Sequence, residues 1–374
     1  MEITTQPIHP TPEKATFTAD RPALDEISAV RQLITCGALS PEQAIDSRLT
    51  IMDESRRCRC LIVRFESGGW AVKQGTTAET GESIRQEAMV YQALKPTTFA
   101  HHLPEFLSYD EDRGLLVIEY VVGESPREAY TAERERRAAI AVSIGAALAR
   151  LHRIDGDLGL MPKPAPPILR CGYPTPASVE FHSRASLQII QAIQSNEALM
   201  SVLNSVRAQW TPEVITHNDL RGDNIIIRES GEPVFIDWEM GGPGDRRWDI
   251  AGLLAERLVW WLTDPDFWVP NNPSETANEA AAIGMKEIRE FSHSFLGSYL
   301  TNFSGTLDLG RAGLSGLMTW CAARLVQFAI ENTHQRSVPL ATSRQLLQIA
   351  ANIRLNPDVA ARTFFGLALN DVND

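Results

Sequence analysis

Two short segments of the chain carry the residues whose types and spacing could do chemistry. The first is the polar stretch 217–224, His-Asn-Asp-Leu-Arg-Gly-Asp-Asn, and the second ends at Asp237, which follows the apolar run Val234–Ile236. Phosphoryl transfer needs one carboxylate that takes a proton from the attacking hydroxyl, and an amide and a second carboxylate that hold Mg²⁺. Asp219, Asn224 and Asp237 offer these groups, and oxygen is the ligand atom that Mg²⁺ prefers. The two segments therefore predict a phosphoryl-transfer site.

The residues between the two segments predict a β-hairpin. Ile225–Ile227 is a β-branched run, Pro233–Ile236 is another, and the polar stretch 228–232 suits a turn between them. The start of the first strand then lies beside the end of the second, which brings Asn224 close to Asp237. Asp and Asn are also common in ordinary loops, so the combination with the hairpin, rather than either residue alone, favours a metal site.

The wider pattern resembles the aminoglycoside phosphotransferase and choline kinase family. The resemblance is carried by His-x-Asp-x-x-x-x-Asn at 217–224, by Ile-Asp-Trp-Glu at 236–239, and by a glycine-rich stretch that leads to Trp-Asp-Ile-Ala at 248–251. It implies an α+β, two-lobed, protein-kinase-like fold. The N-lobe of such a fold is a small antiparallel sheet with one main helix, and the C-lobe is larger and mostly helical.

The resemblance also implies roles for individual residues. Asp219 would be the catalytic base, and Asn224 and Asp237 would ligate Mg²⁺. The segment 217–224 would be the catalytic loop, with His217 as a structural member and Asp249 as a residue that supports it. The chain departs from the usual family pattern after the base, where it has Leu-Arg-Gly-Asp at 220–223. We place Arg221 in the catalytic set because it suits contact with a phosphate or an acidic substrate group.

The residues before the catalytic loop predict the N-lobe. We expect elements in the order strand, strand, strand, helix, strand, strand, at 49–52, 60–65, 70–73, 82–94, 106–109 and 115–122. Lys73 on the third strand and Glu87 on the helix then fall where an ion pair would form, with the lysine holding the nucleotide's α- and β-phosphates. A solvated lysine and a solvated glutamate are the alternative.

Two further segments are candidates for nucleotide binding. The turn Asp53–Arg57 has no glycine, but its backbone N–H groups and Ser55 suit contact with phosphates; a plain surface turn explains it as well. The segment 117–123 resembles the family's hinge, so backbone groups near Glu119 and Val121 would bind the adenine of ATP or the base of GTP. A plain buried strand is the alternative there.

The remaining chain is predicted to be mostly helical. Helical stretches are expected at 24–39, 41–45, 132–154, 187–209, 248–261, 277–301, 314–331 and 341–353, with a short one near the C-terminus. A Gly- and Pro-rich irregular insertion at about 155–183 interrupts them. The domain prediction is a flexible leader at 1–22, an N-lobe at 23–122 and a C-lobe at 123–374. Six acidic residues could line a cleft in the C-lobe, although a solvated helix face explains them equally well: Asp264, Asp266, Glu275, Glu279, Glu287 and Glu290.

Composition limits the class of protein. The 374 residues are 44% hydrophobic and 22% charged, no apolar run is long enough to cross a membrane, and no secretory signal is visible. The five cysteines show no zinc-site spacing, which favours a reducing, cytoplasmic setting. A net charge of −12 argues against a nucleic-acid partner and suits a cationic substrate.

These observations predict a kinase that uses Mg²⁺ and ATP or GTP. The expected acceptor is a hydroxyl of an aminoglycoside-, choline- or sugar-like small molecule. A kinase of peptide or protein Ser/Thr residues is the first alternative, for example one that primes residues for dehydration in peptide maturation. An inactive nucleotide-binding scaffold is the second, and it would be expected to lack a metal ligand or the base.

Overall fold

A computed structural model of the chain describes residues 23–46, 48–65, 68–131, 134–180, 182–264, 276–303, 313–333 and 336–367. The described chain forms two compact units. The first holds the residues up to Arg85 together with Leu107–Ile118, and the second holds Gln86–Phe106 and the residues from Glu119 onward. The predicted leader, 1–22, lies outside the described residues. No helix in the described ranges is both long enough and apolar enough to cross a membrane.

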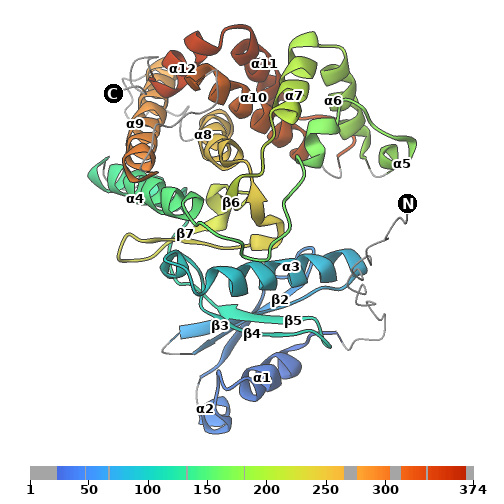
Figure 1. The fold of residues 1–374 in the computed structure, drawn as a ribbon, viewed down its shortest axis with the longest axis vertical. Coiled ribbons are helices and arrows are strands. Elements are labelled where there is room, and N and C mark those ends of the chain that lie inside the picture. Colours follow the sequence, from blue (N-terminus) through green and yellow to red (C-terminus); the bar gives the residue numbers. More distant parts are fainter. Residues whose placement is uncertain are drawn as a thin grey trace, which may run out of the picture. The chain divides into compact units, whose positions relative to one another are not determined.

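The first unit is built on a five-stranded sheet (Figure 1). Its strands are β1 (Thr50–Asp53), β2 (Arg59–Phe65), β3 (Gly68–Gln74), β4 (Phe106–Asp110) and β5 (Leu115–Glu119), in the spatial order β1-β2-β3-β5-β4. Helix α3 (Ala78–Leu94) follows β3, so the predicted element order is confirmed. The helix starts four residues before the expected position because the Thr77 hydroxyl accepts a hydrogen bond from the Thr80 amide (3.2 Å), which caps its first turn.

Helices α1 (Glu26–Thr35) and α2 (Pro41–Asp46) precede the sheet. Asp25 caps α1 through its side chain, and Ser28 caps the Asp25 amide in return. The apolar side of α1, with Ala29 and Leu33, packs in one core with alternate residues of β2, Leu61 and Val63. Alternate strand residues share one face of a sheet, so α1 covers a single face of this one (Figure 1).

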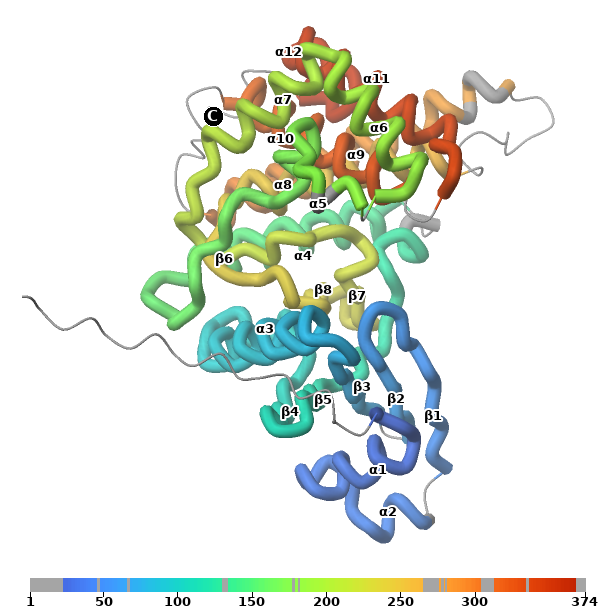
Figure 2. Tube along the Cα trace, turned by 90° about the vertical axis from the view of Figure 1, so that its right-hand side faces the viewer, coloured from blue at the N-terminus to red at the C-terminus, as the bar shows by residue number. Residues whose placement is uncertain are grey.

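The second unit is mostly helical (Figure 2). Its longer helices are α4 (Arg134–His152), α6 (Arg184–Gln194), α7 (Glu197–Ala208), α8 (Arg246–Thr263), α9 (Ala277–Phe303), α10 (Gly313–Glu331), α11 (Ala341–Leu355) and α12 (Pro357–Phe365). α4 packs along α9, and α10 packs against α8 and α11. A Cβ added to Gly145 of α4 would lie 2.3 Å from the Phe295 carbonyl oxygen, so this glycine permits the close approach of α4 and α9.

Two sequence predictions for this unit were wrong. The stretch 187–209, expected as one helix, is the pair α6 and α7, because Asn196 caps a new helix by accepting a hydrogen bond from the Leu199 amide (3.2 Å). The glycine-rich stretch 241–247, for which we expected a loop, contains β9 (Gly242–Gly244), which pairs antiparallel with β6 (Val214–Thr216). A Gly-Pro-Gly strand has no sequence signal, since Gly and Pro are disfavoured in strands.

The insertion at 155–183 is largely irregular, as expected: within 155–180 and 182–183, its regular elements are a 3₁₀ turn at Pro167–Arg170 and the short helix α5 (Pro176–Val179). It is nevertheless joined to the strands around the catalytic loop, since the Lys163 amide donates to the Pro243 carbonyl of β9 (2.7 Å).

Candidate active site

The predicted hairpin is confirmed. β7 (Ile225–Ile227) pairs antiparallel with β8 (Pro233–Phe235), with Ile225 opposite Phe235. One step beyond the paired strands, the Ile236 amide donates to the Asn224 carbonyl (3.0 Å). Asn224 thus lies directly across from the residue that precedes Asp237.

Unusual backbone conformations occur in the same two segments, on either side of the β7–β8 hairpin. Among the described non-glycine residues, Asn218 (φ 57°) and Asp237 (φ 64°) are the two with positive φ. Asn and Asp tolerate this left-handed region better than other residues. Such conformations gather at functional sites, where the surrounding fold maintains them. One precedes Asp219 in the catalytic loop, and the other is the expected metal ligand itself.

The Asn224 side chain is oriented by the loop. Its Nδ2 donates to the Asp219 carbonyl (2.8 Å), which leaves Oδ1 as its atom for a cation. Within the described ranges, no cluster of three or more His, Cys, Asp or Glu side chains could hold a metal by itself. An amide oxygen and a carboxylate suit Mg²⁺, which commonly takes only one or two protein ligands and completes its shell with water and phosphate oxygens.

A buried network holds the start of the catalytic loop. The His217 amide donates to Asp249 Oδ2 (2.8 Å), and His152 Nε2 lies 3.3 Å from the same oxygen. His152 Nδ1 in turn lies 2.8 Å from the Tyr299 hydroxyl. Both His152 and Asp249 are buried, so α4, α8 and α9 together fix the residue two positions before Asp219.

The His217 ring joins the loop to the end of β8. Its Nε2 lies 2.8 Å from the Ile236 carbonyl oxygen, and its ring packs on Trp238 with the centroids 4.5 Å apart. The Trp238 indole donates to the Phe235 carbonyl (2.9 Å). His217 therefore acts as a structural link between the loop and the residues beside Asp237.

Close packing against α8 holds the middle of the loop. A Cβ added to Gly252 of α8 would lie 2.6 Å from the Leu220 carbonyl oxygen and 3.0 Å from Arg324 Nη2. That nitrogen donates to the same carbonyl (3.1 Å), and Arg324 is fully buried. Only glycine at 252 permits this approach of the loop to the helix.

We therefore expect Gly252→Ala to lower both stability and turnover. Overpacking typically costs about 1–3 kcal/mol, which exceeds the gain from alanine's better helix propensity. Gly297→Ala in α9 is the matched control, because nothing lies within 4 Å of its added Cβ. We expect it to melt at or above the wild-type temperature in a calorimetric comparison. Equal behaviour of the two variants would contradict the packing argument.

Glu256 of α8 holds the next position of the loop. Its Oε2 accepts a hydrogen bond from the Gly222 amide (2.7 Å). Burial raises the pKa of Glu256 to about 7, against the opposing effects of Arg257 and of the Gly222 hydrogen bond. A carboxyl group near the catalytic loop therefore titrates close to neutral pH.

This pKa predicts a pH-dependent stability. Between the ordinary pKa of 4.5 and about 7, the folded state keeps a proton that the unfolded state has lost. The contribution of Glu256 is therefore complete at low pH and is lost as the pH rises, by up to about 3 kcal/mol. In urea unfolding, Glu256→Gln should gain stability relative to wild type between pH 5 and pH 8. The exposed control Glu232→Gln should show no such trend, and a parallel pH response of wild type and Glu256→Gln would refute the prediction.

Arg221 lies among carboxylates. Its Nη1 is 3.4 Å from Glu331 Oε2 of α10. Burial disfavours its charge, but the carboxylates of Asp219, Glu331 and Asp223 outweigh that effect and raise the pKa of Arg221. The structure thus places a permanent positive charge near the side chain of Asp219.

Two residues of the predicted hinge, Glu119 and Val121, lie in the second unit. In an antiparallel ladder, the two residues of a hydrogen-bonded pair exchange both backbone hydrogen bonds. Here the Glu119 amide donates to the Glu105 carbonyl (2.9 Å), but the Glu105 amide donates to the Glu119 side chain (3.0 Å). The Glu119 carboxylate therefore takes the place of its own carbonyl as the acceptor for the Glu105 amide. Val121, two positions on, is buried.

Comparison with known proteins decides the family. The model of the phosphotransferase enzyme family, APH, matches residues 59–291, more than half of the chain. The chain belongs to this family. No curated protein matches it significantly.

Solved structures show the fold of the family. An ethanolamine kinase from Plasmodium vivax superposes with a TM-score of 0.53 at 14% identity, over 87% of this chain and 89% of its own. A choline kinase from Streptococcus pneumoniae gives 0.51 at 13%, over 87% and 99%. The ADP-bound aminoglycoside phosphotransferase APH(2'')-Ib gives 0.50 at 15%, over 91% and 100%. The predicted α+β, protein-kinase-like fold is confirmed.

The remaining predicted site residues are distributed over both units. In the first unit, Lys73 pairs with Cys60 across β2 and β3, and the Cys60 amide donates to the Ser55 hydroxyl oxygen (3.0 Å). Ser55 therefore closes the β1–β2 turn. Glu87 lies on the part of α3 that belongs to the second unit, and its side chain is fully buried. Buried glutamates are rare unless paired.

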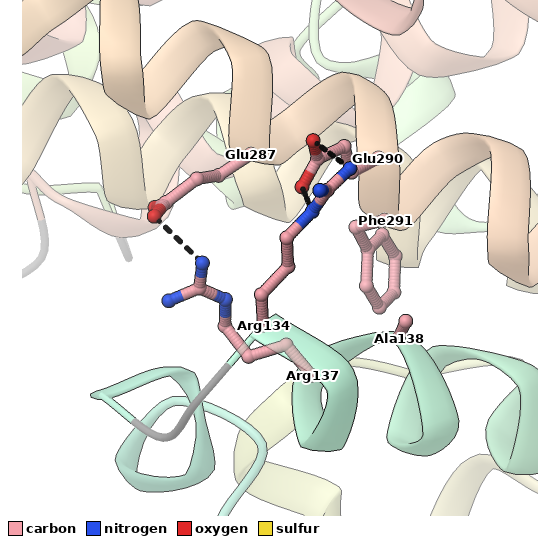
Figure 3. A pocket seen from close by; sticks show the side chains of 6 residues that line it. All are labelled: Arg134, Arg137, Ala138, Glu287, Glu290 and Phe291. Carbon is pink, nitrogen blue, oxygen red and sulfur yellow. Dashed lines mark hydrogen bonds and ion pairs between the residues drawn. The ribbon is translucent and has the colours of Figure 1, made fainter.

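A small pocket lies between α4 and α9 (Figure 3). Its walls include the predicted acidic residues Glu287 and Glu290, each paired with an arginine: Arg137 to Glu287 at 3.0 Å and Arg134 to Glu290 at 2.8 Å. These ion pairs neutralise the carboxylates, so the two residues do not form a negatively charged cleft. Asp266 and Glu275 lie outside the described residues.

Sequence reasoning missed two residues that hold the loop, Glu256 and Arg324. Both are buried. Arg324 is the one charged residue in the stretch 313–330, and this was an available signal because buried charges need partners. Glu256 stands beside Arg257 in a helix with further charged residues, so the sequence carried no such signal for it.

Proposed function

We propose that this phosphotransferase-family chain transfers the γ-phosphate of ATP or GTP to a hydroxyl group of a small molecule, with Mg²⁺. The supporting observation is the geometry around Asn224. Its side chain is bonded to the Asp219 backbone, and its own carbonyl accepts from the residue before Asp237. The expected base and the two expected metal ligands are thereby joined in one hydrogen-bonded unit.

In the proposed reaction, Asp219 orients the acceptor hydroxyl and takes its proton. The hydroxyl oxygen forms a bond to the γ-phosphorus as the bond from that phosphorus to the β–γ bridging oxygen breaks, and ADP or GDP leaves. Asn224 and Asp237 would hold Mg²⁺, and the bound ion would offset negative charge on the phosphates. The positive charge of Arg221 faces the phosphate or an acidic group of the acceptor.

We assign nucleotide binding to the residues that the sequence predicted for it. Lys73 contacts the α- and β-phosphates, and Glu87 orients the lysine. Ser55 and the backbone of its turn contact the phosphates. The Glu119 carbonyl and the Val121 amide bind the base. The ADP-bound aminoglycoside phosphotransferase among the similar structures supports nucleotide use.

The names of similar structures and the net charge support a proposal for the acceptor class. Similar structures include enzymes named for ethanolamine, choline and aminoglycosides, all of them hydroxyl-bearing amines. The net charge of −12 favours attraction of a cation. We propose an aminoglycoside-, choline- or sugar-like acceptor.

An ADP-release assay tests this proposal. The purified chain is incubated with ATP or GTP, with Mg²⁺ or EDTA, and with aminoglycosides, choline, ethanolamine, sugars or Ser/Thr peptides. Mg²⁺-dependent release stimulated by one small-molecule class supports the proposal. Stimulation by peptides alone would instead favour the peptide kinase, and nucleotide binding without any turnover would favour the scaffold.

A further inference from the structure

Three polar residues of α10 form a continuous hydrogen-bonded row beside the catalytic loop. Arg324 Nη1 donates to Gln327 Oε1 (2.8 Å), and Gln327 Nε2 donates to Glu331 Oε1 (2.7 Å). We call Arg324, Gln327 and Glu331 the α10 row. They stand three and four positions apart, so they share one side of the helix.

Both ends of the α10 row contact the loop. At one end, Arg324 Nη2 donates to the Leu220 carbonyl (3.1 Å). At the other, Glu331 Oε2 lies 3.4 Å from Arg221 Nη1. Two adjacent loop residues are therefore joined to α10, Leu220 through its backbone carbonyl and Arg221 through its side chain. They are the two residues that follow Asp219 in the chain.

The two ends of the row differ in burial. Arg324 is buried at 1% exposure and packs over the Trp248 ring. The Arg221 and Glu331 side chains are 32% and 40% exposed. Water competes with an ion pair this exposed, and such pairs add little to stability. The main effect of the Arg221–Glu331 contact is therefore on where the Arg221 guanidinium lies, rather than on the stability of the fold.

Arg221 needs such a restraint. Several carboxylates attract it, and those of Asp219 and Asp223 belong to the same loop. Without Glu331, the Arg221 guanidinium would be free to move toward Asp219 and to form an ion pair with its carboxylate, which must receive a proton. Glu331, held in place by Gln327, draws it toward α10 instead.

We propose that the α10 row positions Arg221 for catalysis, an inference that rests on the proposed phosphotransferase function. Glu331 and Gln327 are positioning residues: they act through Arg221 and do not touch the nucleotide. Small displacements of catalytic groups can lower rates by about 100-fold. We expect a loss of about 10-fold when the exposed end of the row is broken, because Leu220 stays bound to Arg324.

Gln327→Met and Glu331→Gln test the proposal. Both keep side-chain size, and both should lower kcat about 10-fold with the nucleotide KM almost unchanged. Gln348→Met is the matched control, because Gln348 also donates to a residue four positions on, Asn352 Oδ1 (3.0 Å), but on α11. The control should keep wild-type kinetics, and Glu331→Gln and Gln348→Met should melt close to wild type. Gln327→Met also removes an acceptor of the buried Arg324 and should melt somewhat lower.

A double-mutant cycle separates positioning from general damage to the fold. If Gln327 acts through Arg221, Arg221→Ala/Gln327→Met should be no slower than Arg221→Ala alone. The proposal would be overturned if the double variant lost kcat by the product of the two single losses. A wild-type kcat in both Gln327→Met and Glu331→Gln would also overturn it. Amide hydrogen exchange across 218–224 gives a readout that does not depend on turnover.

The exchange measurement also distinguishes the two proposals. Faster exchange at 218–224 in Gln327→Met, but not in Gln348→Met, supports positioning even if no acceptor or ADP release is found. In that case the proposed function is refuted, but the inference that the α10 row positions the loop is retained. Unchanged exchange together with unchanged kinetics would refute positioning by the α10 row and would leave the proposed function intact.

Discussion

Asp219→Asn should lower phosphorylation of the acceptor by about 100-fold to 10⁴-fold, the range that a general base contributes. An amide of the same shape can still accept a hydrogen bond from the hydroxyl, but it cannot take its proton. The bond from Asn224 goes to the Asp219 backbone carbonyl and is kept in the variant. We therefore expect a melting temperature close to wild type and unchanged nucleotide affinity. The measurements are ADP release, thermal unfolding and nucleotide titration.

Asp223→Asn is the control for this prediction. It removes the same charge from the same loop, at a side chain that is exposed. We expect its loss to be no more than about 10-fold, since an exposed charge is screened by solvent. Comparable losses in the two variants would mean that loop charge, rather than proton transfer at Asp219, limits the rate.

Asp237→Asn should have the second large effect, a loss of about 100-fold or more that added Mg²⁺ partly reverses. The amide is a weaker ligand for a hard cation than the carboxylate is, so the Mg²⁺ concentration at half-maximal rate should rise. Asparagine also suits the positive φ of this position (64°), as Asn218 shows at φ 57°. The variant therefore removes a charge without adding backbone strain. A Mg²⁺ titration of ADP release measures the effect.

Asp237→Ala distinguishes the ligand from the backbone. Alanine also lacks the carboxylate but fits the left-handed conformation poorly, at a cost of about 1 kcal/mol or more. We expect both variants to lose activity and only the alanine variant to lose stability. A normal Mg²⁺ dependence in Asp237→Asn would remove this residue from the metal site.

Local pattern was enough for several elements. The apolar runs 225–227 and 233–236, separated by a polar turn, predicted β7 and β8, because strand-forming side chains and turn residues act over a few positions. The same reasoning predicted the element order of the first unit. Boundaries shifted where one side chain changed the end of an element, as with Thr77 before α3 and Asn196 before α7.

Other contacts had no local signal. β6 and β9 pair across about 28 residues, and β9 is Gly-Pro-Gly. The partners of the catalytic loop are farther away still: Glu256 is 34 residues from Gly222, and Arg324 is 104 from Leu220. Periodicity identifies the helices that carry these residues, but it does not say which loop each charged side chain meets.

The sequence by itself determined the chemistry that is offered: a carboxylate, an amide and a second carboxylate around a hairpin, in the pattern of a phosphotransferase family. Residue type and short-range spacing fix these features because a strand, a turn and a positive-φ Asp or Asn depend on only a few neighbours. The sequence pattern also implied that Asp249 supports the loop, and the structure shows its hydrogen bond from the His217 amide. Only the tertiary structure revealed the other two residues that hold the loop, Glu256 of α8 and Arg324 of α10. A buried charge is stable only with a partner, and the partner is chosen by packing between segments far apart in the chain.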